Sequence, residues 1–280
     1  MTELVLVTLL AAGLFALPPS AHALILALGI ATGMPHGATD LITEDGRISR
    51  PALAYYGVGI LLLGLLWWWA PGWALGVFLV LSMLHFGSED AASDSGTALF
   101  IHESVVRGLI VVLAPSIFYE SEVLRLFGLL ADESWAGPTW DRLRSATQTA
   151  WIALAFTLFG HYAVRATAWR HVAFVFIQML VLVGIFRVLP PLTAFVAYFV
   201  GGHSLHSARK IWPVLRAHWG KVLGATLFTF AVASLVFLNG GEAAWGDRLV
   251  RTAFISLSLF AVPHGIWRTA EVLRGRWSKA

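Results

Sequence analysis

Cysteine is absent from the 280 residues of this chain, and charged residues are scarce. Without cysteine there can be no disulfide, thiolate zinc site, iron–sulfur cluster or cysteine nucleophile. Any bound metal must therefore be held by histidine and carboxylate. Asp, Glu, Lys and Arg make up 12% of the chain, about half of the roughly 25% that is usual in soluble domains. With 58% hydrophobic residues, this composition argues against a soluble protein and excludes a disordered one.

Long stretches without charge take the place of the missing polar residues. The longest runs from Pro51 to Ser88, and at about 1.5 Å per helical residue it could cross a hydrocarbon core of about 30 Å nearly twice. Ala70-Pro71-Gly72 interrupts this run, which predicts two consecutive spans. Ten hydrophobic segments lie near residues 3–17, 21–36, 52–69, 72–87, 104–118, 147–164, 172–187, 190–206, 222–239 and 252–267.

These segments predict helices rather than strands. The run from Leu61 to Trp69 is apolar throughout, whereas strands of a membrane barrel alternate polar and apolar residues. Several segments are shorter than the roughly 20 residues of an ideal spanning helix. We therefore predict an all-α, polytopic membrane bundle with eight to ten spans, some short or broken. It forms a single transmembrane domain over residues 1–280, with an interfacial helix near Glu122–Leu130.

Positive charge predicts the orientation of the chain. The net charge is +3, and Lys and Arg concentrate near residues 165–170, 209–221 and 268–279. With ten spans these regions lie on one side, which the positive-inside rule assigns to the cytoplasm. We predict a multi-pass protein of the cell (inner) membrane with both termini cytoplasmic. Because the charge bias reports loop orientation, we expect no nucleic-acid partner.

Five of the ten histidines lie at or near the ends of apolar segments: His36, His85, His203, His206 and His264. Under a ten-span topology these segment ends emerge on the same membrane face. Ionisable residues inside spans are costly and usually face the interior of the bundle, and imidazole suits iron, zinc, copper and nickel. A histidine-rich metal centre is therefore favoured, with a proton relay or buried structural polar groups as alternatives.

Carboxylates follow two of these histidines at helical spacing. Asp40 comes four residues after His36, and Glu89 four after His85, so each carboxylate could accept the second ring N–H of a metal-bound histidine. His203 and His206 are three residues apart and would share a helix face.

Four short elements occur in an order that resembles a known family. They are Pro-His-Gly-Ala-x-Asp from Pro35 to Asp40, His-Phe-Gly-x-x-Asp from His85 to Asp90, Tyr198-Phe199 shortly before His203-Ser204, and Val262-Pro263-His264. Together they resemble the Brp/Blh family of bacterial and archaeal membrane-embedded β-carotene 15,15′-dioxygenases, from about residue 25 to 270.

The resemblance implies an Fe(II)-dependent enzyme. Its members use O₂ and a non-haem Fe(2+) held by histidines to cleave the central 15,15′ double bond of β-carotene, or a related carotenoid, into retinal. The apolar substrate would enter from the lipid bilayer, and a functional link to a retinal-binding rhodopsin would follow.

The resemblance also assigns residues to roles. His36, His85 and His203 match family ligands, while the family spaces its last two histidines four apart, which puts Ser207 at the second place and His206 one residue early. We predict His36, His85, His203 and His206 as catalytic ligands and His264 as a further metal ligand. Asp40, Glu89 and Asp90 would orient the ligands. The substrate channel would be lined by Phe86, Phe159, Phe195, Tyr198, Phe199 and Trp267.

Two other functions stay open on the sequence. A different histidine-rich membrane oxidoreductase, of the di-iron type, would carry more histidines in each cluster. A transporter or binding protein of the same architecture would use half-helices broken by Pro and Gly. Counting one iron, two irons or none per chain would separate the three.

Overall fold

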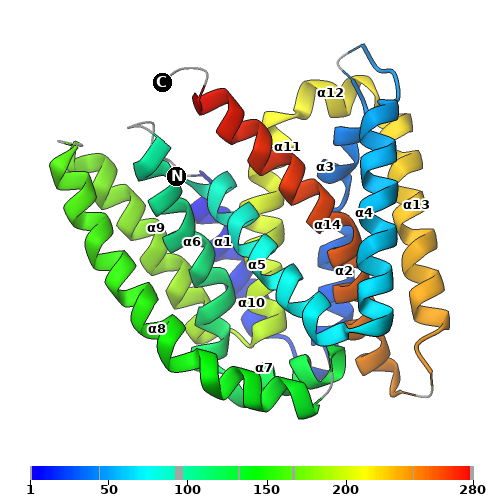
Figure 1. The fold of residues 1–280 in the computed structure, drawn as a ribbon, viewed down its shortest axis with the longest axis horizontal. Helices are drawn as coiled ribbons and strands as arrows, with labels where there is room; N and C mark the ends of the chain where they lie inside the picture. The colour runs from blue at the N-terminus through cyan, green and yellow to red at the C-terminus, as the bar shows by residue number, and fades with distance from the viewer. Residues whose placement is uncertain are drawn as a thin grey trace. The chain divides into compact units, whose positions relative to one another are not determined.

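The structure is a computed structural model that describes residues 2–43, 45–91, 97–131, 133–165, 168–241 and 243–277. Nearly all of these residues are helical (Figure 1). No strand forms among them, and one isolated bridge joins Ile42 and Ile48. The all-α prediction is confirmed.

The chain divides into two compact units. The first combines Met1–Ala74 with Leu192–His264, and the second combines Leu75–Pro191 with Gly265–Ala280. The last helix, Trp245–Trp277, contributes residues to both. That the whole chain forms one transmembrane domain stays a prediction.

The first unit is built around a π-helical segment. Its elements are α1 (Thr2–Phe15), η1 (Pro19–Ala21), α2 (His22–Gly33), α3 (Pro35–Ala38), η2 (Thr39–Leu41), α4 (Arg50–Trp69), α10 (Pro191–Tyr198), the π-helix η3 (Phe199–Ser204), α11 (Leu205–Lys210), α12 (Trp212–Ala217), α13 (Trp219–Leu238) and the first part of α14 (Trp245–Trp277). Both α1 and α2 pack against η3. Insertions of this kind into α-helices occur frequently at functional sites.

Local sequence explains where α4 begins and ends. The Ser49 hydroxyl accepts a hydrogen bond from the Ala52 N–H, and Pro51 occupies the first turn, where its missing N–H costs nothing. The helix ends at Trp69, because Pro71 begins the next one. Charge-free sequence on both sides of this break therefore gives two helices, as predicted.

The second unit packs around one long apolar helix. It contains α5 (Pro71–Asp90), α6 (Thr97–Phe118), α7 (Glu120–Leu130), α8 (Glu133–Val164), α9 (Trp169–Val188) and the end of α14. Helix α6 packs against α8 and α9, and α7 packs against α8. An interfacial helix was predicted near Glu122–Leu130; α7 confirms the helix, and its place at the membrane interface stays a prediction.

A buried polar network joins α6, α8 and α9. The Glu103 carboxylate accepts hydrogen bonds from Arg107 Nε at 2.7 Å and from the Tyr162 hydroxyl at 2.8 Å, while Arg107 Nη2 donates to Gln178 Oε1 at 2.9 Å. Glu103 is fully buried. An apolar environment penalises unpaired charge heavily, so this closed set of partners makes the buried pair tolerable.

Six helices in the described residues are long and apolar enough to cross a membrane: α4, α5, α6, α9, α13 and residues Trp245–Arg274 of α14. Val5–Phe15 and Pro19–Leu41 form a pair bent by 120°, which would make seven if it counts as one span. The predicted eight to ten spans are not confirmed. The segment near 190–206 is not a regular span, because it passes from α10 into η3 and then α11.

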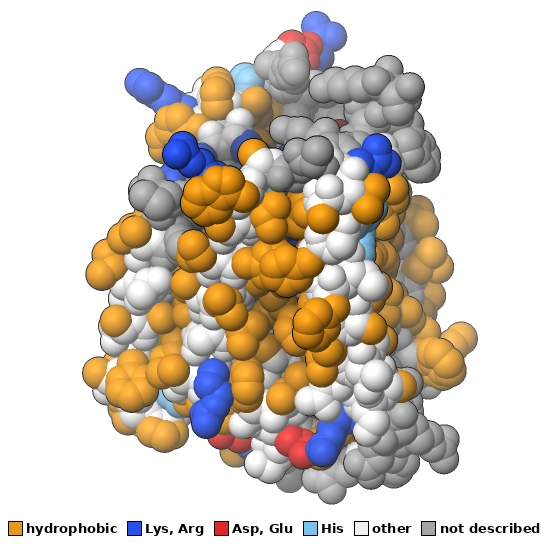
Figure 2. All heavy atoms as spheres, turned by 90° about the vertical axis from the view of Figure 1, so that its left-hand side faces the viewer, with side chains coloured by type: hydrophobic (Ala, Val, Ile, Leu, Met, Phe, Trp, Pro, Cys, Tyr) orange, Lys and Arg blue, Asp and Glu red, His pale blue; other side chains and the backbone are white. Residues whose placement is uncertain are grey.

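Apolar side chains on the surface agree with a membrane environment. On the face drawn in Figure 2, hydrophobic side chains are spread over the middle of the face, and the charged side chains that the view shows lie toward its upper and lower ends. Within the second unit, Phe156 and Leu180 expose 72% and 69% of their surface on α8 and α9. Such exposure is costly in water and favourable against lipid. The choice of membrane and the side on which the termini lie stay predictions, and residues 278–280 lie outside the described part of the chain.

Candidate metal centre

Three of the five predicted histidines come together in the first unit. His36 lies in α3, His203 in η3 and His264 in α14, and all three are buried. The ring centre of His36 is 5.3 Å from that of His203 and 5.1 Å from that of His264, and both pairs meet edge to face. We call these three residues the histidine cluster.

A short helix after a break directs His36. Helix α2 ends at Gly33, and Pro35 occupies the first turn of the four-residue helix α3. Proline suits that position because an N–H there would have no helical partner, so the lack of one in proline costs nothing. His36 Nδ1 donates to the Gly33 carbonyl at 2.5 Å, and the Thr39 hydroxyl donates to the His36 carbonyl at 2.7 Å. Because the helix breaks here, His36 Nδ1 can donate to the carbonyl of Gly33, the last residue of α2.

Close helix packing places His203. A Cβ on Gly33 would lie 2.2 Å from the Phe199 ring, so only glycine lets α2 approach η3 this closely. The Phe199 ring in turn stacks on His203 at 5.9 Å between ring centres and lies 6.4 Å from His36. An aromatic side chain therefore packs against two of the three imidazoles.

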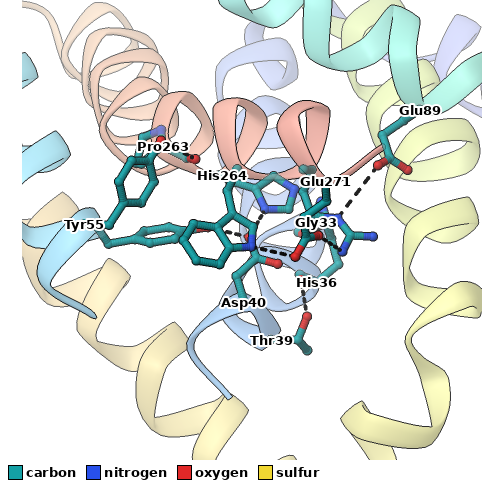
Figure 3. Close-up of polar contacts among 12 residues, drawn as sticks. Gly33, His36, Thr39, Asp40, Tyr55, Glu89, Pro263, His264 and Glu271 are labelled. Atoms are coloured by element: carbon teal, nitrogen blue, oxygen red, sulfur yellow. Dashed lines mark hydrogen bonds and ion pairs between the residues drawn. The ribbon is translucent and has the colours of Figure 1, made fainter. Parts of the chain in front are cut away.

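His264 is held by a carboxylate from another part of the chain. Its Nδ1 donates to Asp40 Oδ2 at 2.7 Å, and the same oxygen accepts the Tyr56 hydroxyl at 2.6 Å (Figure 3). Asp40 was expected to orient His36, four residues earlier. The structure pairs Asp40 with His264, and Asp40 lies in the 3₁₀ turn η2, after α3 has ended at Ala38.

The chemistry of these donors fits a divalent metal. A metal-bound histidine usually donates its other ring N–H to a carbonyl or carboxylate, and both His36 and His264 donate Nδ1–H in this way. The lone pair then lies on Nε2. Two imidazoles bound to one ion through bonds of about 2.1 Å have ring centres about 4.5–5.5 Å apart, in agreement with both separations. Ser204, next to His203, also buries a hydroxyl oxygen that has no hydrogen-bond partner among the described residues.

The cluster is not by itself a completed ligand set. Within the part of the chain that the structure describes, no three His, Asp or Glu side chains stand close enough together to hold one ion. The first unit therefore provides pairs of imidazoles with suitable spacing and tautomer, and any further ligand must come from elsewhere in the chain or from a small rearrangement.

His85 belongs to the second unit. It is buried near the end of α5, where a Cβ on Gly265 would lie 2.9 Å from its own Cβ. Glu89 is buried and lies 3.8 Å from Arg268 Nε, while Asp90 at the end of α5 is partly exposed. Glu89, predicted to orient a ligand, thus faces a cation of the same unit.

The predicted substrate-lining aromatics are distributed over both units. In the first, Phe195 stacks on Phe199 at 5.4 Å, and Tyr198 lies 6.4 Å from His203. In the second, Phe86 is buried 5.6 Å from the ring of His85, Phe159 stacks on Phe176 of α9 with 46% of its surface exposed, and the half-exposed Trp267 donates to Glu271. Of these aromatics, Tyr198 and Phe199 lie beside His203 in the first unit, and Phe195 packs on Phe199.

Burial separates the two candidates for the last ligand. Ser207 comes four residues after His203 and is buried, whereas His206 is partly exposed. Residues four apart share a helix face more closely than residues three apart. Of the two candidates, the Ser207 hydroxyl is therefore more buried than the His206 imidazole.

Comparison with known proteins identifies the family of the chain. A sequence model of the β-carotene 15,15′-dioxygenase family matches residues 27–267. The chain belongs to this family. A β-carotene 15,15′-dioxygenase from the uncultured marine bacterium 66A03 is 29% identical over 260 residues, which cover 86% of this chain and 90% of the relative. No solved structure matches.

The match to the dioxygenase family includes every predicted site residue. His36 lies near its beginning and Trp267 at its end, and η3 lies within it. All of α1 lies before the match, although α1 packs directly against η3. The recognition made from four short motifs is confirmed.

Tyr56 is the member of the site that sequence reasoning missed in this dioxygenase-family chain. It is buried in α4 and donates to Asp40. The available signal was weak, since a tyrosine in an apolar helix usually serves as membrane-interface or core packing. Its neighbour Tyr55 donates to the Pro263 carbonyl at 3.3 Å, so Tyr55 contacts the backbone next to His264 directly, and Tyr56 reaches the His264 ring through Asp40.

Proposed function

We propose that this chain is a membrane-embedded, Fe(II)-dependent dioxygenase that cleaves the central 15,15′ double bond of β-carotene, or a related carotenoid, with O₂. The bond between the two central carbons breaks, and each carbon receives one oxygen atom, which yields two molecules of retinal. The retinal would serve a retinal-binding protein such as a rhodopsin. Membership of the dioxygenase family supports carotenoid cleavage.

The observation that carries the proposal is the buried histidine cluster. His36 and His264 each give Nδ1–H to an acceptor, which leaves Nε2 as the nitrogen that would hold iron. His203 completes the cluster, His85 stays a predicted ligand in the second unit, and His206 stays a predicted ligand on α11. Ferrous iron held by neutral imidazoles would bind and activate O₂, and the electrons that reduce O₂ would come from the carbon–carbon double bond that breaks.

The protein's own part in the reaction is to orient the polyene and exclude water. Phe199 and Phe195 stack in sequence, and Phe254 of α14 lies 6.0 Å from Phe195. These three rings form a continuous apolar surface next to His203, and a conjugated chain could pack on that surface. A dry, aromatic environment keeps water from the reactive carbons, and an apolar substrate would reach it from the surrounding lipid.

Retinal formation in carotene-accumulating bacterial cells tests the proposal. We expect retinal from the wild-type chain and none from His36→Ala, because one cluster imidazole is lost. His22→Ala is the matched control, since His22 begins α2 of the same unit, is only partly buried and lies outside the cluster. It should make as much retinal as the wild type.

Iron content separates the proposal from its alternatives. One iron per purified chain is expected, and two would favour a di-iron oxidoreductase. Iron-free protein that moves a solute across vesicles would favour a transporter. Full retinal production by His36→Ala would contradict the assignment of the cluster.

A further inference from the structure

Three separated segments of the first unit converge on one carboxylate oxygen. Asp40 lies in η2, Tyr56 in α4 and His264 in α14, and Asp40 Oδ2 accepts a hydrogen bond from each of the other two, at 2.6 and 2.7 Å. Figure 3 shows the His264 ring lying against Asp40. This convergence depends on how α4, α14 and the turn η2 pack against one another, since each contributes one of the three side chains.

The carboxylate is buried, which makes its partners necessary. The side chains of Asp40 and His264 are 5% and 9% exposed, and Tyr56 is 6% exposed. A buried carboxylate is strongly destabilising unless donors compensate for the lost water. The Tyr56 hydroxyl and the His264 N–H provide such compensation, so removing the tyrosine hydroxyl takes away one of these two donors.

The arrangement also decides how His264 presents its ring. An acceptor at Nδ1 requires the proton there, so the basic nitrogen is Nε2. The ring is held edge to face with His36 at 5.1 Å, a spacing that two ligands of one ion would have. Hydrogen bonds of this kind raise the basicity of a ligand and fix its direction.

We propose that Tyr56 and Asp40 are positioning residues that hold His264 as an iron ligand beside His36. The inference rests on the proposed function and extends it to Tyr56 and to the identity of the partner of Asp40. Asp40 acts through His264, and Tyr56 acts through Asp40. Neither residue touches the substrate or the metal in this assignment.

Iron affinity of the purified full chain tests the positioning role. Metal-free protein in detergent is titrated anaerobically with Fe(II) against a competing chelator, and with Co(II), whose visible absorption reports the number and kind of ligands. Loss of a hydrogen bond to a metal-bound histidine typically costs 10–100-fold in affinity. We expect Tyr56→Phe to weaken Fe(II) binding by about 10-fold and Asp40→Asn by up to about 100-fold, with altered Co(II) bands.

Trp67→Phe provides the matched control. Trp67 Nε1 donates to Ser258 Oγ at 2.7 Å. Like Tyr56→Phe, this variant therefore removes one hydrogen bond made by α4, but this bond goes to α14 and does not reach Asp40. The melting temperature of the metal-free protein should fall by similar amounts in Tyr56→Phe and Trp67→Phe. Only Tyr56→Phe should lose Fe(II) affinity and change the Co(II) spectrum.

The outcomes distinguish this inference from the function beneath it. Wild-type affinity and spectrum in Tyr56→Phe, or equal losses in Tyr56→Phe and Trp67→Phe, would overturn the positioning role and leave the dioxygenase proposal standing. A wild-type chain that binds no Fe(II) and makes no retinal would overturn both.

Discussion

At the scale of single residues, burial and hydrogen bonding divide the histidines into different kinds. His36, His203 and His264 are buried, and their rings lie within 5.3 Å of at least one other ring of the cluster. His102 and His161 form a separate pair in the second unit, with their Nδ1 atoms 3.3 Å apart. A buried imidazole must have its polar atoms satisfied, so the contacts of each ring indicate its role better than its position in the sequence.

The last ligand position gives a prediction at this scale. Because His203 is almost fully buried against Phe199 while His206 is partly exposed, we expect His203→Ala to lose nearly all bound iron. His206→Ala, which removes the more exposed of these two predicted ligands, should lose a smaller share of the iron. Iron per chain, measured by elemental analysis of purified protein, checks both variants. Equal losses would mean that α11 turns to bring His206 to the metal, contrary to the burial observed.

At the scale of helices, the π-helix η3 and the small residue facing it fix the position of His203. Helix α2 can approach η3 because Gly33 has no side chain, and Phe199 fills the space where a Cβ would be. The ring of Phe199 then packs on His203. A change at Gly33 would therefore act on the histidine cluster through a neighbouring ring rather than through direct contact.

Gly33→Ala should therefore both destabilise the protein and lower its iron content. The added methyl lies 2.2 Å from a buried ring, and overpacking of this kind costs about 1–3 kcal/mol. Gly57→Ala in α4 is the control, because nothing lies within 4 Å of its added methyl and alanine favours a helix over glycine by about 0.5–1 kcal/mol. Thermal unfolding in detergent measures the stability of both variants, and iron per chain is measured as for His203→Ala. A Gly33→Ala protein as stable as Gly57→Ala would show that α2 does not pack this closely.

At the scale of the whole molecule, the number of spans decides which loops lie on which side of the membrane. Six apolar helices qualify by length and composition, and α13 is the simplest to test because exposed residues flank it. Ala217 lies just before the helix and Asn239 just after it. If α13 crosses the bilayer, these two residues must lie on opposite sides.

The absence of cysteine makes this a direct experiment. A single cysteine at either position is the only thiol in the chain. We expect Ala217→Cys and Asn239→Cys to react with a membrane-impermeant maleimide from opposite sides of intact, oriented vesicles. Labelling of both from the same side would rule out α13 as a span and would require a different topology.

Sequence by itself determined the class of the molecule, the family and most helix positions. Nonpolar surroundings leave the backbone no partner except itself, so long apolar runs must become helices, and Pro71 marks the break between α4 and α5. The residues of the cluster could also be found, since His36, His203 and His264 stand at the ends of apolar segments beside Pro or Gly.

Tertiary structure alone decided which groups meet. Spacing pairs Asp40 with His36, four residues apart on an unbroken helix, but α3 ends before Asp40 and the 3₁₀ turn directs its carboxylate toward α14. Tyr56 joins them from a third segment. Such contacts depend on the mutual register of separate helices, which packing at residues such as Gly33 sets and no periodicity within one segment encodes.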